Sequence, residues 1–482
     1  MLRTLSSFLV AAALSLAALI LGPILDKLPP PPDPPPVPDV VPLPPPVPTS
    51  AYPSRASADG VLSLSGALSG SHVLVGADGS LTLVADVHAS KLAAGAAPPL
   101  DLALVIDRSG SMAGPKLKAA KDAARSLIDR ARPDDRVTLI AYGSTVTMLA
   151  RGVPGTRSGK AELLAAVDRI EDFGGTFISG ALEAAGRALQ SGHPGRVKRL
   201  ILLSDGEANE GVTSRRGLTR LAERLSGQGI TISSVGFGVD FDEDTMLALA
   251  DASGGRYAYV RGPADLSGVL GQELLDAGQT VAREILLRLR PRDGTTLETL
   301  YGYPSTRQDG EVWVRLRDLE SEGHARVVAT LRAPTGIPGG VPVVELTLQY
   351  QIADPATAAR YAGGMATTAF TLGHTVVDDA ELVERGRDRE VLAAGARAYA
   401  AEALDQAARA YAEGRQREAQ RVLRTRLEEV MLQNRATIGS ADLSREFEAL
   451  EAEADFDAAP AGSDRGRDMV KSMKARAVRM AR

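Results

Sequence analysis

The stretch LALVIDRSGS, residues 102–111, joins an uninterrupted apolar run to a cluster of small oxygen-bearing side chains. The run Leu102–Ile106 contains no polar residue, which predicts a strand buried on both faces, as the strands of parallel sheets are. Asp107, Ser109 and Ser111 follow at alternate positions. Taken alone they are weak evidence of a binding site, because Asp and Ser are also common in turns and at helix N-caps.

Strand-like and helical segments alternate between about residue 100 and residue 275. The apolar strand-like runs cover residues 102–106, 137–142, 200–203, 230–235 and 257–260. The amphipathic helical segments begin after Pro115 and continue at 160–170, 179–190, 215–226 and 243–252. This alternation predicts a doubly wound, Rossmann-like α/β domain with a mainly parallel sheet.

Two further segments place oxygen ligands at strand and helix ends. The segment FGGTFISGAL (173–182) has Thr176 after two glycines, at the start of a helix. The segment LILLSDGEANEG (200–211) reads as a buried strand that ends in Asp205-Gly206. Open α/β sheets bind ligands at the carboxyl ends of their strands. We therefore expect Asp107 and Asp205 to meet there, with Thr176 close by.

The pattern D-x-S-x-S, then a separate Thr, then Asp-Gly resembles the metal-ion-dependent adhesion site of von Willebrand factor A domains. The resemblance covers about residues 98–272, and the segments 134–144 and 229–260 agree with it. Strand-like segments flank this region, as they do in bacterial A-domain proteins and, more distantly, in inter-alpha-inhibitor heavy chains.

The resemblance implies a role for each of the five matched residues. Ser109, Ser111 and Thr176 would bind the ion through their hydroxyls, and Asp107 and Asp205 mostly through ordered waters. Oxygen ligands of this kind suit a hard divalent cation, Mg²⁺ first, with Mn²⁺ or Ca²⁺ as alternatives. Neutral hydroxyls leave the ion under-compensated, so an acidic side chain of a protein partner could enter an open coordination position.

Two charged residues depart from a simple oxygen site. Arg108 puts a cation beside the ion, and its side chain either points outward or attracts an acidic partner. Glu207 follows the Asp-Gly pair, where it could compete for the metal or shape specificity.

A second acidic motif resembles the start of a calcium loop. Asp240, Asp242 and Asp244 stand at alternate positions, but Thr245 occupies the place of the required glycine. We expect this motif to cap the helix that begins near Asp244.

The N-terminus carries the signals of a membrane-tethered protein. Arg3 precedes an apolar stretch of about 18 residues, just long enough to span a bilayer. Thirteen prolines in the twenty positions 29–48 predict an extended stalk. We expect an uncleaved, single-pass signal-anchor in the inner (cytoplasmic) membrane, with the bulk of the chain periplasmic or extracellular; the alternative is secretion after signal cleavage.

The chain as a whole is predicted to have seven regions. They are a signal-anchor or signal peptide (1–28), a Pro-rich stalk (29–50), a β segment (51–97), the A domain (98–275), a second β segment (276–372), a helical hairpin (373–450) and a basic flexible tail (451–482). The two β segments are expected to form one β-sandwich into which the A domain is inserted.

Composition excludes several classes of function. The chain has no cysteine, which rules out disulfides and thiolate metal sites. Its net charge of −5, from 55 basic and 60 acidic residues, does not suggest a nucleic-acid partner. The sequence has neither a P-loop nor a nucleophile elbow, so we expect no enzyme.

The leading functional hypothesis is a membrane-tethered extracytoplasmic protein that binds a protein partner through the metal site. The alternative is an assembly or regulatory subunit of a multiprotein complex, such as secretion or ATPase-linked machinery.

Overall fold

The computed structural model describes residues 52–93, 97–190, 195–292, 294–454, 456–457 and 459–482. The predicted signal-anchor (1–28) and stalk (29–50) lie outside these residues. None of the helices in the described ranges is long and apolar enough to cross a bilayer.

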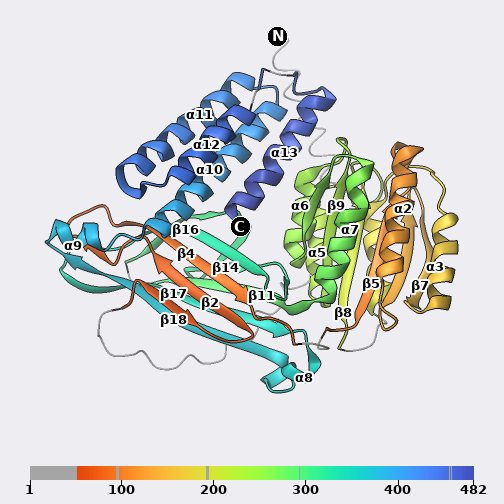
Figure 1. Ribbon diagram of the computed structural model, residues 1–482, viewed down its shortest axis with the longest axis horizontal. Coiled ribbons are helices and arrows are strands. Elements are labelled where there is room, and N and C mark those ends of the chain that lie inside the picture. Colours follow the sequence, from red (N-terminus) through yellow and green to blue (C-terminus); the bar gives the residue numbers. More distant parts are fainter. Residues whose placement is uncertain (1–51, 94–96, 191–194, 293, 455, 458) are drawn as a thin grey trace, which may run out of the picture. The chain divides into compact units, whose positions relative to one another are not determined.

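A six-stranded sheet forms the centre of the α/β domain (Figure 1). Its order is β10-β9-β8-β5-β6-β7, and only the edge pair β6–β7 is antiparallel. The strands are β5 (Leu100–Asp107), β6 (Arg136–Tyr142), β7 (Val146–Pro154), β8 (Val197–Ser204), β9 (Ile230–Phe237) and β10 (Tyr257–Val260). Every residue of β5 is buried, as its apolar run predicts.

Helices cover both faces of this sheet (Figure 1). They are α2 (Pro115–Arg130), α3 (Arg157–Asp168), α4 (Ile178–Gln190), α5 (Arg215–Ser226), α6 (Glu243–Ser253) and α7 (Pro263–Gly278). Alternate residues of β5 serve two apolar clusters: Leu104 and Ile106 pack with α2 and α7, whereas Ala103 and Val105 pack with α4 and α5. The predicted doubly wound α/β sheet is confirmed.

The strands before and after the α/β domain pair directly with each other. A five-stranded sheet has the order β1-β2-β4-β16-β12, and a seven-stranded sheet the order β13-β14-β11-β17-β18-β3, with β15 paired to β11. Pairing of β4 with β16 runs antiparallel from His88 opposite His324 to Ser80 opposite Arg332. The two sheets share one apolar cluster, which includes Leu64 and Leu346.

The strands of these two sheets span two parts of the sequence. Before the α/β domain come β1 (Arg55–Ala58), β2 (Leu62–Leu68), β3 (His72–Leu74) and β4 (Ser80–Ala89). After it come β11 (Thr280–Pro291), β12 (Thr296–Tyr301), β13 (Ser305–Gln308), β14 (Glu311–Arg315), β15 (Leu319–Glu320), β16 (His324–Arg332), β17 (Gly339–Ile352) and β18 (Met365–Val377). A short helix, α8 (Pro355–Ala358), lies between the last two strands.

The C-terminal region is a cluster of helices larger than the predicted hairpin (Figure 1). It contains α10 (Arg389–Ala412), α11 (Gln416–Gln433), α12 (Ala441–Glu453) and α13 (Asp464–Ala481). A short helix before it, α9 (Ala380–Arg385), contacts β3 and β18 instead. The break between α10 and α11 falls at Gly414, whose φ of +77° suits glycine. The predicted start at residue 373 is too early, because β18 continues to Val377.

The prediction of a basic flexible tail at 451–482 is wrong over α13. Val470, Met473 and Ala477 recur at helical spacing and pack into the apolar cluster of the C-terminal helices. Several basic residues of α13 are paired with carboxylates, so the positive charge of the segment stabilises a packed helix. Lys471, for example, lies 2.7 Å from Glu243 of α6.

Candidate functional site

The candidate site lies where two neighbouring parallel strands end. The last residue of β5 is Asp107, and β8 ends one residue before Asp205. The two ends are level in the sheet, since Ile106 pairs with Leu203. Both carboxyl groups are fully buried, so each needs a polar partner at this edge.

Local hydrogen bonds fix the carboxylate of Asp107. Its Oδ1 accepts the backbone N–H of Ser109 at 2.8 Å, and its Oδ2 accepts the hydroxyl of Ser204 at 2.7 Å. Burial raises the pKa of Asp107, while the hydrogen bonds from these two serines oppose the rise. Ser204 was not identified in the sequence, although it directly precedes Asp205.

The two serines of the motif connect the ends of the two strands. Ser109 and Ser111 place their hydroxyl oxygens 3.0 Å apart across a single 3₁₀ turn, Gly110–Met112. The hydroxyl of Ser111 then donates to Oδ1 of Asp205 at 2.7 Å. The side-chain oxygens of Ser109, Ser111 and Asp205 therefore form one short hydrogen-bonded chain, although Asp205 is far from the serines in the sequence.

Thr176 reaches the same place from the loop before α4. Its side chain is buried, and its backbone N–H donates to Oδ1 of Asn209 at 2.8 Å. A Cβ atom on Gly206 would lie 3.6 Å from Oγ1 of Thr176 and 3.7 Å from Oγ of Ser111. Both hydroxyls therefore border Gly206, where the missing side chain leaves space beside them.

A lysine that the sequence reasoning missed also contacts the site. Lys116, in the first turn of α2, lies 2.6 Å from Oδ2 of Asp205 and 3.9 Å from Oδ2 of Asp240. The signal was available, because α2 starts just after the D-x-S-x-S loop and its first turn must therefore lie at the same edge of the sheet.

Arg108 is directed toward the neighbouring edge strand. Its guanidinium donates to the carbonyl of Glu171 at 3.3 Å and to the hydroxyls of Thr145 and Thr147. It also lies 6.0 Å from the centre of the Phe173 ring, and Phe173 is 59% exposed. Glu207 is exposed as well.

The second acidic motif caps a helix, as predicted. Asp242 is the N-cap of α6, and its carboxylate accepts the N–H of Thr245 at 3.1 Å. Asp240 and Asp244 form ion pairs with basic residues, including Arg467 and Lys474 of α13. The expectation that this motif is no calcium loop rests on the missing glycine.

The chemistry of the candidate site suits a hard cation. The hydroxyls of Ser111 and Thr176 border Gly206. The hydroxyl of Ser109 and the carboxylate of Asp205 each contact the hydroxyl of Ser111, and Asp107 is hydrogen-bonded to Ser109 and Ser204. All five donors are oxygens, as Mg²⁺, Mn²⁺ and Ca²⁺ prefer. A positive charge, the ammonium of Lys116, already contacts Asp205. Within the described ranges, no three His, Cys, Asp or Glu side chains gather in a way that could hold a metal, and the candidate site depends on hydroxyls.

Comparisons with known proteins agree with the resemblance seen in the motifs. Residues 101–270 match the von Willebrand factor type A domain. The chain is 33% identical over 197 residues to the uncharacterized protein sll0103 of Synechocystis, covering 40% of this chain and 46% of that protein. It is 28% identical over 181 residues to inter-alpha-trypsin inhibitor heavy chain H2 of Mus musculus, covering 36% and 19%. These matches span less than half of each relative.

Two solved structures share the fold over most of the chain. A von Willebrand factor type A protein from Catenulispora acidiphila has a TM-score of 0.62 at 19% identity, over 84% of this chain and 89% of that chain. The ArnB paralog VWA2 from Sulfolobus acidocaldarius has a TM-score of 0.56 at 17% identity, over 88% and 100%. At such identities the likeness shows the fold alone.

Proposed function

Residues 101–270 are a von Willebrand factor type A domain, and we propose that this domain binds a protein partner through a divalent cation, Mg²⁺ first. The residues proposed to hold it are Asp107, Ser109, Ser111, Thr176 and Asp205. Domains of this type generally mediate protein–protein interactions. The proposal assigns the domain no catalytic step.

The chain of oxygen atoms from Ser109 through Ser111 to Asp205 is the observation that carries the proposal. When bound, the cation supplies positive charge and an open position for an acidic group. The chain's own residues prepare that position: Asp107 cannot turn away while Ser109 and Ser204 hold it, and Gly206 leaves room beside the hydroxyls of Ser111 and Thr176.

The loops around the site favour a partner with mixed chemistry. Phe173 and Val212 are 59% and 45% exposed, and each lies in a loop that also carries a site residue, Thr176 or Asp205. Arg108 lies beside Phe173 and adds a positive charge. These features support a partner that presents an acidic side chain flanked by apolar residues.

The membrane tether and the location of the protein are proposed from the sequence alone. Arg3 and the apolar stretch after it support an inner-membrane anchor with the A domain periplasmic or extracellular. We further propose that the strands on either side of the A domain form one β-sandwich, interrupted by its insertion. Reporter fusions at residue 50 test the topology, and activity from a cytoplasmic reporter alone would contradict it.

The metal-dependent function is tested by capture of partner proteins on the immobilised full chain. Capture in Mg²⁺ is compared with capture in EDTA, for the wild type and for Asp107→Ala. We expect a set of proteins that the wild type retains only with Mg²⁺ and that Asp107→Ala does not retain. Asp122→Ala, an exposed carboxylate on α2, is the matched control and should behave as the wild type. Identical capture in all four conditions would overturn the proposal.

A further inference from the structure

We infer that Lys116 is an internal competitor for the metal: its ammonium occupies Asp205 when no cation is bound and moves to Asp240 when one binds. The inference rests on the proposed metal site and adds a residue that sets the affinity of that site. Three observations carry it: the contact of Lys116 with Asp205, the chemistry of that contact, and the second carboxylate within reach.

Both oxygens of the Asp205 carboxylate have partners. Oδ1 accepts the hydroxyl of Ser111 at 2.7 Å, and Oδ2 lies 2.6 Å from the ammonium of Lys116. The side chain of Asp205 is fully buried, while that of Lys116 is 30% exposed. The contact is therefore largely shielded from solvent on the carboxylate side, and a cation approaching Asp205 meets Lys116 there.

The two partners of Asp205 respond differently to a metal ion. The hydroxyl of Ser111 has lone pairs as well as a proton, so it can turn and become a ligand. The ammonium of Lys116 has three donors and no acceptor, so it cannot bind a metal. Placed within a few ångströms of a divalent cation it would be strongly repelled. A metal ion bound beside Asp205 and the close contact of Lys116 with Asp205 therefore exclude each other.

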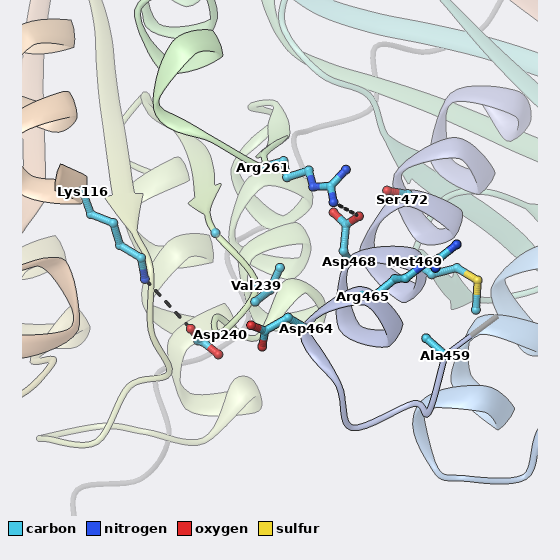
Figure 2. A pocket seen from close by; sticks show the side chains of 11 residues that line it. Lys116, Val239, Asp240, Arg261, Ala459, Asp464, Arg465, Asp468, Met469 and Ser472 are labelled. Carbon is cyan, nitrogen blue, oxygen red and sulfur yellow. Dashed lines mark ion pairs between the residues drawn. The ribbon is translucent and has the colours of Figure 1, made fainter.

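A second carboxylate is ready to receive the displaced ammonium. Asp240 follows β9, and its Oδ2 already lies 3.9 Å from Lys116. Figure 2 shows the lysine extended toward Asp240. Both residues line a cleft of about 850 Å³. Asp464 and Asp468 of α13 also line this cleft. Arg261 and Arg465 line the cleft as well, and Asp468 is paired with Arg261. The carboxylate within reach of the displaced ammonium is therefore that of Asp240.

The C-terminal helix α13 keeps Asp240 in place. Its Arg467 lies 3.2 Å from Oδ1 of Asp240. The helix itself is fixed to the A domain further along, where Lys474 lies 2.8 Å from Asp244 and Arg482 lies 2.6 Å from Asp251. Arg467 therefore pairs with one oxygen of the Asp240 carboxylate, while the other oxygen faces Lys116.

The first test is titration of the full chain with Mn²⁺ alone, for the wild type, Lys116→Met and Lys118→Met. Lys118→Met is the matched control. It removes the same charge from the same helix, but Lys118 pairs with Asp122 at the surface. We expect Lys116→Met to bind Mn²⁺ about tenfold more tightly than the wild type, and Lys118→Met to bind within about twofold of it. Equal or weaker binding by Lys116→Met would overturn the inference.

The outcomes separate this inference from the proposed function. If the wild type binds Mn²⁺ and Lys116→Met binds it no more tightly, Lys116 is not a competitor, but the proposed metal site is still supported. Absence of binding in both chains overturns both proposals. Lys116→Arg keeps the positive charge and should bind no more tightly than the wild type. Equal melting temperatures in the metal-free state show that each variant is folded.

The second test asks whether Asp240 receives the ammonium. Asp240→Asn is combined with Lys116→Met in a double-mutant cycle, with the Mn²⁺ dissociation constant as the readout. We expect Asp240→Asn to weaken binding about threefold or more in the wild-type background, and by less when Lys116 is already replaced. Equal effects in the two backgrounds would mean that Asp240 acts only through its own charge, and would overturn this part of the inference.

Discussion

In the central sheet of the A domain, charged side chains are paired differently at the amino ends of the strands and at their carboxyl ends, which we call the two edges. At the amino ends of β8 and β9, Arg199 lies 3.2 Å from Asp318, which also accepts the hydroxyl of Thr231 at 2.7 Å. Arg199 and Asp318 are both buried. At the carboxyl ends, the buried Asp107 and Asp205 meet hydroxyls and one lysine.

The difference follows from what each edge contacts. Asp318 belongs to the chain just before β15, so the pair with Arg199 connects the A domain to the strands that follow it. An arginine is always charged, so the charge of the basic partner in this pair does not change with pH. At the other edge hydroxyls can donate or accept, and the lysine is partly exposed. The buried pair therefore attaches the A domain to the following strands, whereas the carboxyl ends of the strands carry the side chains proposed to bind a cation.

Removal of Asp318 should have the largest effect of the changes considered. Asp318→Ala leaves the buried guanidinium of Arg199 without its main partner, and we expect a loss of about 3–5 kcal/mol in the free energy of unfolding. Urea denaturation measures this loss, with Asp122→Ala as the exposed control, expected to lose less than about 1 kcal/mol. A loss below about 1 kcal/mol in Asp318→Ala would show that this edge does not depend on the pair.

An apolar replacement of both partners sharpens the same comparison. The double variant Arg199→Met, Asp318→Leu removes both charges together, and we expect it to recover most of the stability that Asp318→Ala loses. Metal affinity should stay at the wild-type value in both variants, because the two edges lie at opposite ends of the strands. A change in Mn²⁺ affinity of more than about threefold would show that the edges are coupled.

Replacement of Thr176, at the carboxyl ends of the strands, should have an intermediate effect on partner binding. Thr176→Ala removes one of the proposed oxygen ligands, and we expect metal-dependent partner binding to weaken by about 1.5–3 kcal/mol, or roughly ten- to a hundredfold. Thr176→Ser keeps the hydroxyl and should remain within about threefold of the wild type. Binding assays and melting temperatures are compared in the same variants. Equal binding by all three chains with Mg²⁺ present would exclude Thr176 as a ligand.

The smallest expected effect concerns the contact of α13 with the A domain in acid. Burial alone would raise the pKa of Glu243, but the hydrogen bond from Lys471 and the charges of Lys474 and Lys471 lower it to about 2. A carboxyl group whose pKa is lower in the folded protein stabilises the fold at pH values above its ordinary pKa of 4.5. That contribution is lost as the pH falls toward about 2.

Glu243→Gln should remove this acid-sensitive contribution. Between pH 5 and pH 3 we expect the melting temperature of the wild type to fall more than that of Glu243→Gln. Glu381→Gln, an exposed carboxyl on α9, should follow the wild type. Parallel curves for the wild type and Glu243→Gln would mean that these lysines do not stabilise the carboxylate.

Much of the sheet and the grouping of the candidate residues could be predicted from the sequence. Continuous apolar runs identified the inner strands, and the rule that parallel strands end at one edge placed Asp107 near Asp205. The edge strand β7 was missed because it alternates irregularly and pairs with β6 through two register shifts. The helix α7 was missed although it starts with Pro263 at a favourable first-turn position.

The contacts that no local pattern encodes could not be predicted. The loop before α2 indicates that Lys116 lies at the carboxyl ends of the strands, but no local pattern indicates that its partner is Asp205, 89 residues later in the chain. The basic residues of α13 suggested a solvated tail, because their carboxylate partners lie more than two hundred residues earlier in the chain. The pairing of β4 with β16 likewise depends on the whole fold.

The measurement that tests the account most directly is an anomalous diffraction map from crystals of the protein grown with Mn²⁺. The account predicts one anomalous peak at the carboxyl edge of the sheet, about 2.1 Å from hydroxyl oxygens of Ser109, Ser111 and Thr176. It also predicts that the ammonium of Lys116 has moved from Asp205 to Asp240. A map without a peak at these hydroxyls, with Lys116 still on Asp205 at saturating Mn²⁺, would contradict it.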